Sequence, residues 1–184
     1  MLILKIPEKE VFNPITSEII FIKETTLKLE HSLYAMALWE SKWCKPFLSI
    51  DGTPKSKEES ADYIRCMTIN IDEVDDRIFE LLSPSEQKVI NDYMGAKHTA
   101  TWFSEKEGQS RRPKEVVTTE VIYHWMIEAG IPAEFDKWNF DRLNTLIRVR
   151  NEKSGNQKKM SKNEILRNNA QLNAARRQRL GTKG

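Results

Sequence analysis

The chain has 184 residues, of which 39% are hydrophobic and 30% are charged, and its formal net charge is +2. This composition is typical of a globular chain rather than a disordered one, and the length accommodates one domain of about 150 residues plus an extension. No apolar run approaches the roughly 20 residues that cross a bilayer, so we expect a protein without a membrane partner.

The N-terminal part of the sequence is typical of β-strands. Residues 2–6 (LILKI) and 18–24 (EIIFIKE) are rich in β-branched and aromatic side chains, and residues 26–30 (TLKLE) alternate between apolar and polar. Asn13 and Pro14 are typical turn residues. The alternation predicts an antiparallel sheet with one face on a core.

Helical signals follow in the next segment. Apolar side chains recur at three- and four-residue steps in residues 31–43, and Pro46 predicts that this helix ends before it. Ser56 with Glu59 forms a capping box that opens a helix reaching about Met67. The acidic stretch 71–82 predicts a short helix.

Another capping box, Ser83 with Glu86, has Pro84 at the first helical position and opens a helix that Gly95 ends. Two β-type runs separated by a polar loop then predict a hairpin over residues 98–118. Its tip carries Arg111 and Arg112, which we interpret as solvated loop charges.

Two helices complete the predicted domain. Thr118 or Thr119 caps an apolar helix that ends at Gly130, and residues 138–151 give a second helix with a broad apolar face. The prediction is an α+β domain over residues 1–150, in which the N-terminal strands and the 98–118 hairpin form a small antiparallel sheet packed with several helices.

Composition changes after Asn151, where residues 151–184 predict a linker and a basic, partly helical C-terminal arm. Ser161 and Glu164 form a third capping box, and a helix could continue to Gly181, but its apolar stripe is too thin to hold it alone. Residues 148–184 contain 11 Lys and Arg against two Glu, a charge of +9, so the remainder carries −7. Such asymmetry usually concerns partners.

Motifs for catalysis, phosphate binding and metal binding are absent from the sequence. The three histidines, His31, His98 and His124, have no ligand spacing, and Cys44 and Cys66 form no CxxC pair. We therefore expect no enzymatic activity, no cofactor and no metal. The isolated thiols fit a reducing compartment, and the apolar start of the chain is too short for a signal peptide.

Trp39 and Trp43 lie four residues apart and so share a helix face, with Lys42 and Lys45 interleaved. Three interpretations remain open for this segment: a part of the core with lysines at its rim, an anchor for another protein, or a platform for nucleic-acid bases.

The arm also has three interpretations. It could bind phosphates of a nucleic acid, dock on a protein as an amphipathic helix, or act as a solubilising tail. We predict partner binding by the arm and the two tryptophans, through Lys158, Lys159, Met160, Lys162, Leu166, Arg167, Leu172, Arg176, Arg177, Arg179, Trp39 and Trp43.

Several segments resemble one family of proteins. They are EVVTTEVIYHWMIEAGIP, WNFDRLNTLIRVRN and KKMSKNEILRNNAQLNAARRQRLGTKG, with LKLEHSLYAMALWESKWCKPFL and TATWF earlier in the chain. Together they resemble small morphogenesis proteins of tailed phages and prophages, chiefly of Gram-positive hosts, which are described as tail assembly chaperones or phage structural proteins.

The resemblance implies a non-enzymatic bacteriophage protein that binds the tape-measure or tail-tube protein during tail assembly in the host cytoplasm. A permanent structural protein of the virion, in the tail, neck or baseplate, is one alternative. A nucleic-acid-binding accessory protein is another.

Overall fold

The computed structural model describes residues 1–13, 18–48, 54–103 and 116–155. It divides into two compact units, Met1–Arg148 and Val149–Gly184. Within the described residues it is an α+β structure, with five α-helices and two two-stranded antiparallel ladders, so the predicted fold class is confirmed.

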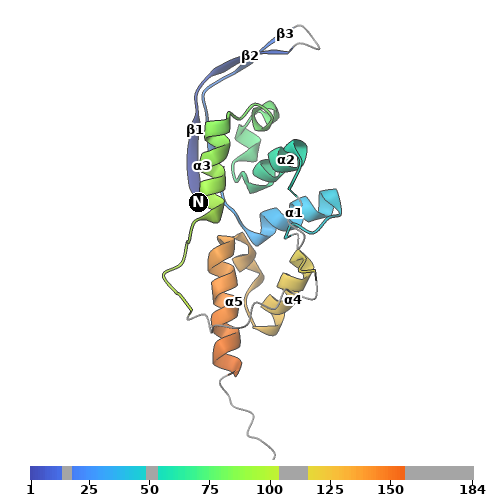
Figure 1. Cartoon of the computed structure of the whole chain (residues 1–184), viewed down its shortest axis with the longest axis vertical. Coiled ribbons are helices and arrows are strands. Elements are labelled where there is room, and N and C mark those ends of the chain that lie inside the picture. The colour runs from blue at the N-terminus through green and yellow to red at the C-terminus, as the bar shows by residue number, and fades with distance from the viewer. Residues whose placement is uncertain (14–17, 49–53, 104–115, 156–184) are drawn as a thin grey trace, which may run out of the picture. The chain divides into compact units, whose positions relative to one another are not determined.

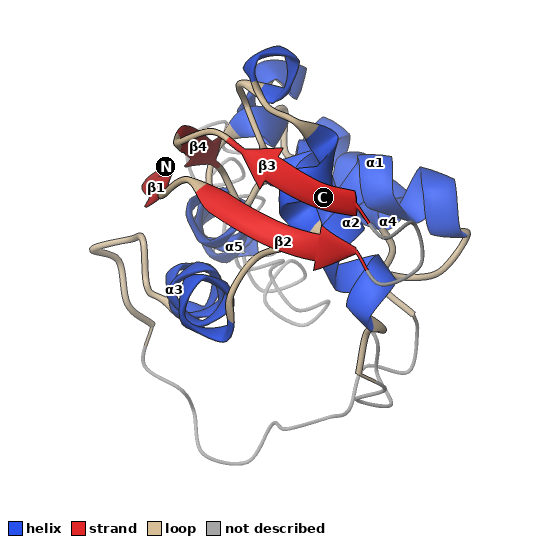
Figure 2. Ribbon diagram, turned by 90° about the horizontal axis from the view of Figure 1, so that it is seen from above, coloured by secondary structure: helices blue, strands red, loops and turns tan. Residues whose placement is uncertain are grey.

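One long hairpin, interrupted in the middle, supplies all four strands. Its inner half pairs β1 (Leu2–Ile6) with β4 (Thr25–Leu29), and its outer half pairs β2 (Lys9–Asn13) with β3 (Glu18–Ile22). Figure 2 shows β2 and β3 side by side, and Figure 1 shows them continuing past the helices. The sequence analysis missed β2, whose five residues contain only two apolar side chains.

The two halves keep a single register. Leu2 stands opposite Leu29, and Lys9 stands opposite Ile22, so no residue is inserted between the ladders. Pro7 lies at the interruption, where its missing N–H cannot contribute to a ladder. The buried face nevertheless changes sides there, because an unbroken pleat would place Ile6 and Ile22 on opposite faces, and both are buried.

Local signals position the first helices as predicted. α1 (Leu33–Trp43) begins after Ser32, whose side chain accepts a hydrogen bond from the Ala35 amide, and it ends before Pro46. α2 (Lys57–Met67) begins at the predicted capping box of Ser56 and Glu59.

α3 (Pro84–Gly95) begins at the second predicted capping box, in which Ser83 and Glu86 exchange hydrogen bonds. Between α2 and α3, the short helix expected over residues 71–82 is instead two 3₁₀ turns, η1 (Ile71–Glu73) and η2 (Asp76–Phe79). Asp75 explains the break, because its side chain accepts from the Arg77 amide and so starts a new turn.

Three elements follow the long loop: α4 (Thr119–Glu128), η3 (Ala133–Lys137) and α5 (Phe140–Gly155). The linker predicted after Asn151 is helical as far as Gly155, because Glu152 and Lys153 are good helix formers and continue the ladder of α5. The arm beyond it, including the third capping box of Ser161 and Glu164, lies outside the described residues.

The hairpin predicted over residues 98–118 is wrong in its described parts, because residues 98–103 and 116–118 form no strand. The backbone there is bound elsewhere. The amide of His98 donates to the Asp141 carboxylate at 2.8 Å, and the amide of Thr101 donates to the Thr99 hydroxyl. Arg111 and Arg112 lie outside the described residues.

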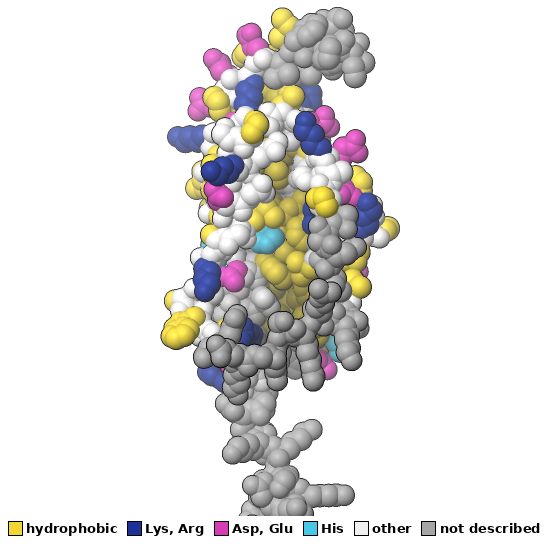
Figure 3. Space-filling model, viewed as in Figure 1, with side chains coloured by type: hydrophobic (Ala, Val, Ile, Leu, Met, Phe, Trp, Pro, Cys, Tyr) yellow, Lys and Arg dark blue, Asp and Glu magenta, His cyan; other side chains and the backbone are white. Residues whose placement is uncertain are grey.

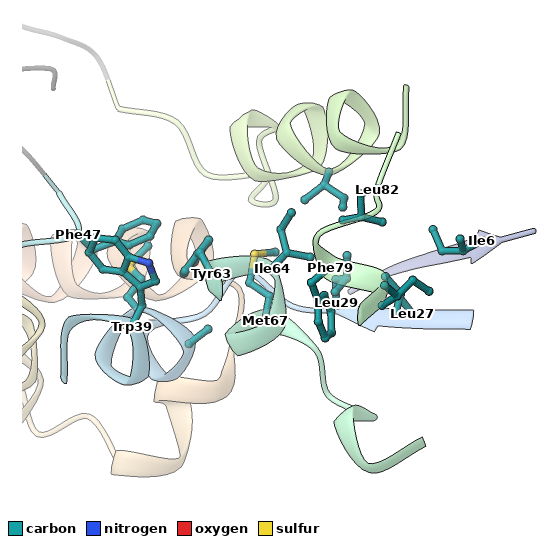
Figure 4. Packing of buried hydrophobic residues seen from close by; sticks show 14 of the residues in the cluster. Ile6, Leu27, Leu29, Trp39, Phe47, Tyr63, Ile64, Met67, Phe79 and Leu82 are labelled. Atoms are coloured by element: carbon teal, nitrogen blue, oxygen red, sulfur yellow. The ribbon is translucent and has the colours of Figure 1, made fainter. Parts of the chain in front are cut away.

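Two groups of buried apolar residues form the core. The larger one joins the inner hairpin to α1, α2, η2 and α3, and Figure 4 labels ten of its residues, among them Leu27, Trp39 and Tyr63. The smaller one joins α4 and α5 to Leu33 of α1. Phe140 packs against both groups, so the core is continuous within the first unit.

Candidate functional site

The segment with Trp39 and Trp43 lies on the last two turns of α1 and forms an aromatic cluster. The two indole rings stack with their centroids 6.2 Å apart, and the Phe47 ring meets Trp39 edge-on at 5.4 Å. The helix ends at Trp43 with Cys44 in the left-handed conformation, and Pro46, which could not continue the helix, leads into Phe47. On the face in Figure 3, apolar side chains gather in the middle and charged side chains of both signs surround them.

Trp39 belongs to the core. Its side chain is only 2% exposed, and its indole N–H donates to the backbone carbonyl of Glu59 at 2.8 Å. Because the Trp39 indole is buried, it presents no surface to a partner. Of the two tryptophans predicted to bind a partner, only Trp43 is then accessible for such a contact.

Trp43 is half-buried and lies at the rim. Its indole N–H donates to the Asp62 carboxylate at 2.9 Å, and Lys42 forms an ion pair with the same carboxylate. Lys45 pairs with Glu59 at 2.6 Å. Both predicted lysines are thus neutralised by acids of α2, which leaves little net positive charge for a phosphate group.

Lys55 is also part of the cluster, although the sequence analysis did not identify this residue. Its ammonium lies 3.9 Å from the centroid of the Phe47 ring and donates to the Phe47 carbonyl at 2.9 Å. Burial lowers the pKa of Lys55, and the nearby carboxylates of Glu59 and Glu40 oppose that shift.

An open groove of about 820 Å³ runs from this cluster along α2. Trp43, Ile64 and Phe79 supply apolar parts of its lining, whose charged side chains are four basic and four acidic. A groove of balanced charge with a tryptophan at one end is typical of a protein contact rather than of a nucleic-acid channel.

Glu40 connects the two groups of core residues. Its side chain is buried, and one carboxylate oxygen accepts from the Phe47 amide at 2.6 Å. The other accepts from the amide and the hydroxyl of Thr119, at 2.8 and 2.5 Å. The carboxylate therefore caps α4 from a distance, where Thr118 supplies no side-chain cap.

A second polar group lies where β4 leads into α1. Glu30 accepts from the Tyr93 hydroxyl at 2.6 Å and from the Asn139 amide at 3.1 Å, and it pairs with the Met1 ammonium at 2.7 Å. Burial acts to raise the pKa of Glu30, but these hydrogen bonds and the ammonium outweigh it and lower the pKa.

His31 is buried beside this group. Its Nδ1 lies 2.6 Å from the Tyr63 hydroxyl, and the rings of Phe47, Tyr63 and Phe140 surround it. Burial lowers the pKa of His31 from 6.5 to about 4, so the imidazole is neutral at physiological pH. Its contacts fix the positions of elements in the core.

The other titratable candidates have different surroundings. His98 contacts Tyr93, whereas His124 lies near Glu128 on α4. Burial raises the pKa of Cys66 to about 11, so its thiol is protonated, and Cys44 is exposed at the end of α1. Within the described residues, no three His, Cys, Asp or Glu side chains are placed to hold a metal ion, and no helix could span a membrane.

The arm residues predicted to bind a partner lie outside the described residues and stay a prediction: Lys158, Lys159, Met160, Lys162, Leu166, Arg167, Leu172, Arg176, Arg177 and Arg179.

A further apolar surface was missed by sequence reasoning. Ile19 and Phe21 on β3 are 69% and 49% exposed. The sequence EIIFI contains the signal that could have predicted this surface. Its apolar residues fall on both faces of the strand, whereas the core covers only one face.

Comparison with protein families, with curated proteins and with solved structures finds no match to this chain.

Proposed function

We propose that this protein acts by protein–protein binding in the morphogenesis of a tailed phage, as a tail assembly chaperone. The basic C-terminal segment holds its partner, a tape-measure or tail-tube protein. The resemblance to phage morphogenesis proteins supplies the biological setting, and the separation of charge along the chain supports the mode of binding.

That separation is the observation that carries the proposal. Residues 149–184 contain 10 Lys and Arg against two Glu, a charge of +8, whereas residues 1–148 carry −6. The change of charge coincides with the division between the two units at Arg148. A strongly basic segment attached to an acidic body can attract an acidic partner without binding strongly to neighbouring copies of the same segment.

Partner binding by the full chain tests the proposal directly. Three forms of the protein are titrated against the tail-tube and tape-measure proteins of the same phage. They are the full chain, a truncation after Asn156, and a variant with Arg176, Arg177 and Arg179 changed to Gln. We expect the truncation to abolish binding and the triple variant to weaken it about tenfold, or about 1.4 kcal/mol.

A matched control removes the same charge from the body. Lys5, Lys88 and Lys97 are exposed, and changing all three to Gln alters the net charge as much as the arm variant does. We expect this control to bind as the full chain does. Equal binding by the full chain and the truncation would overturn the proposal.

A nucleic acid is the alternative partner that the basic segment favours, because lysine and arginine also neutralise phosphates. A gel-shift titration at several salt concentrations separates the two functions. A nucleic-acid function would be favoured if the logarithm of the binding constant falls steeply with the logarithm of the salt concentration. The slope should then be the same for nucleic acids of unrelated sequence. The same alternative predicts no saturable binding to tail proteins.

Mass spectrometry of mature particles separates an assembly chaperone from a permanent virion component. A chaperone is absent from purified particles but present in the lysate. Peptides of this chain at stoichiometric levels in the particle would favour the structural role instead.

A further inference from the structure

The outer half of the hairpin, β2 with β3, has a strand edge with which no further strand pairs among the described residues. We call this half the outer ribbon. On the β2 side, Lys9 donates to the Leu81 carbonyl at 3.2 Å and pairs with Glu86 at 2.5 Å, which ties the ribbon to α3. On the other side, β3 pairs with β2 alone within the described residues. Such an edge is a template for another strand.

The outer face of the ribbon is apolar where it meets this edge. Ile19 and Phe21 lie on that face and are exposed. Ile22 lies on the opposite face, towards the helices, and is buried. A two-stranded ribbon by itself is only marginally stable in water. Further strands that cover the edge and these two side chains would stabilise it.

The order of residues in β3 makes the strand complementary to itself. Two antiparallel strands related by a two-fold axis pair residues symmetrically about the residue on the axis. With Ile20 on the axis, Ile19 of each strand stands opposite Phe21 of the other, on the same face. Both exposed apolar side chains then gain a β-branched or aromatic partner, the pairing that stabilises antiparallel sheets.

Charge distinguishes this register from one of its two neighbours. Placing Phe21 on the axis would set Glu18 of one strand opposite Glu24 of the other, and like charges directly opposite each other are destabilising. The axis at Ile20 avoids that pair.

We propose that two copies of this chain associate through their β3 strands, antiparallel and with the two-fold axis at Ile20. The two outer ribbons then form one four-stranded sheet. Because each copy contributes a five-residue strand, we expect a contact smaller than the roughly 1,200–2,000 Å² of stable complexes, and therefore a weak dimer that depends on concentration.

Charge variants at the paired positions test both the dimer and its register. In one variant Ile19 and Phe21 are both changed to Lys, and in the other both are changed to Glu. In the proposed register each variant sets two pairs of like charges opposite each other. Sedimentation equilibrium should show a dimer for the full chain and at least tenfold weaker association for each variant. An equimolar mixture of the two variants should recover the dimer, because every pair is then of opposite charge.

Matched controls come from exposed apolar residues elsewhere, Ile69 and Val89, changed together to Lys. This control should dimerise as the full chain does, and circular dichroism should show all variants folded. A chain that stays monomeric at every concentration would overturn the proposal. So would a dimer that both charge variants retain, or a mixture that fails to recover it.

Cross-linking gives a second measurement of the register. In a chain with Cys44 and Cys66 changed to Ser, Ile20→Cys places one thiol on the axis, facing its copy. Opposite residues of an antiparallel pair lie about 4.5–5.5 Å apart at Cα, which permits a disulfide. Ile20→Cys should therefore oxidise to a covalent dimer much faster than the control Ile3→Cys, which is exposed on β1. Equal rates would overturn the register.

The chain truncated after Asn156 separates this inference from the proposed function. It should dimerise normally although it lacks the basic segment. A dimer that disappears with the segment would show that the segment, and not β3, joins the copies. Capture of an extended strand from a tail protein, with no dimer at any concentration, would assign the β3 edge to that partner instead.

Discussion

The inner and outer halves of the hairpin share one register and similar residues, but they differ in what covers them. In the inner half, Leu27 and Leu29 are completely buried under the helices. In the outer half, Ile19 and Phe21 are exposed although their strand is just as apolar. Strand pairing thus continues through both halves, whereas burial depends on which face of the ladder lies on the helices. Ile22 is buried on that face, and Ile19 and Phe21 lie on the opposite face.

Truncating a buried side chain of the inner half should give the largest effect. Leu27→Ala removes apolar volume from a site that is 0% exposed and should lower the free energy of unfolding by about 2–5 kcal/mol. Ile19→Ala is the matched change in the outer half and should cost less than about 0.5 kcal/mol in dilute, monomeric protein. Urea unfolding of both variants measures the difference. Similar losses would break the comparison.

Acidic pH should lower the free energy of unfolding through His31, which lies between β4 and α1. Burial lowers the pKa of His31 from 6.5 to about 4, so the unfolded chain takes up a proton before the folded chain does. The contribution of His31 is therefore fully present above about pH 6.5 and is lost as the pH falls towards 4. The loss amounts to about 3 kcal/mol. Urea unfolding between pH 7.5 and 4.5 measures it, and His31→Asn should flatten this part of the profile.

Removing the tie between the outer ribbon and α3 should have a smaller effect. Lys9→Ala deletes a partly buried ion pair with Glu86 and a hydrogen bond to Leu81, and should cost about 1 kcal/mol. Hydrogen exchange should accelerate in β2 and β3 much more than in β1 and β4. Uniform acceleration in all four strands would show that the two halves open together.

The smallest effect is expected from a change outside the hairpin, which tests whether the two halves of the hairpin respond differently. Cys44 ends α1 with φ at 52°, a left-handed conformation that favours glycine. Cys44→Gly should raise the free energy of unfolding by about 0.5–1 kcal/mol. Exchange in the inner strands, which follows global unfolding, should slow accordingly, whereas exchange in the outer ribbon should stay unchanged.

Features of the fold that depend on near neighbours in sequence could be predicted. Ser56 with Glu59, and Ser83 with Glu86, fix the starts of α2 and α3 through bonds that span three residues, and the structure contains all of them. The strand type of residues 2–6 and 18–22 follows in the same way from their own composition.

Features that depend on distant residues could not be predicted. The β-type run that contains Trp102 forms no strand, because its backbone bonds to Asp141 on α5 and to its own side chains. Similarly, Trp39 and Trp43 share a helix face, but only the position of α2 buries the first and leaves the second at a rim. The same holds for Ile19, whose exposure depends on which face of β3 lies on the helices.

The buried carboxylate of Glu40 has a consequence for how the first unit unfolds. It holds the chain after α1 with one oxygen and the start of α4 with the other. If α4 detached, the buried carboxylate would lose two of its three donors, a state that costs several kcal/mol. Partial opening at the C-terminal helices is therefore penalised, and the first unit should melt in a single cooperative transition.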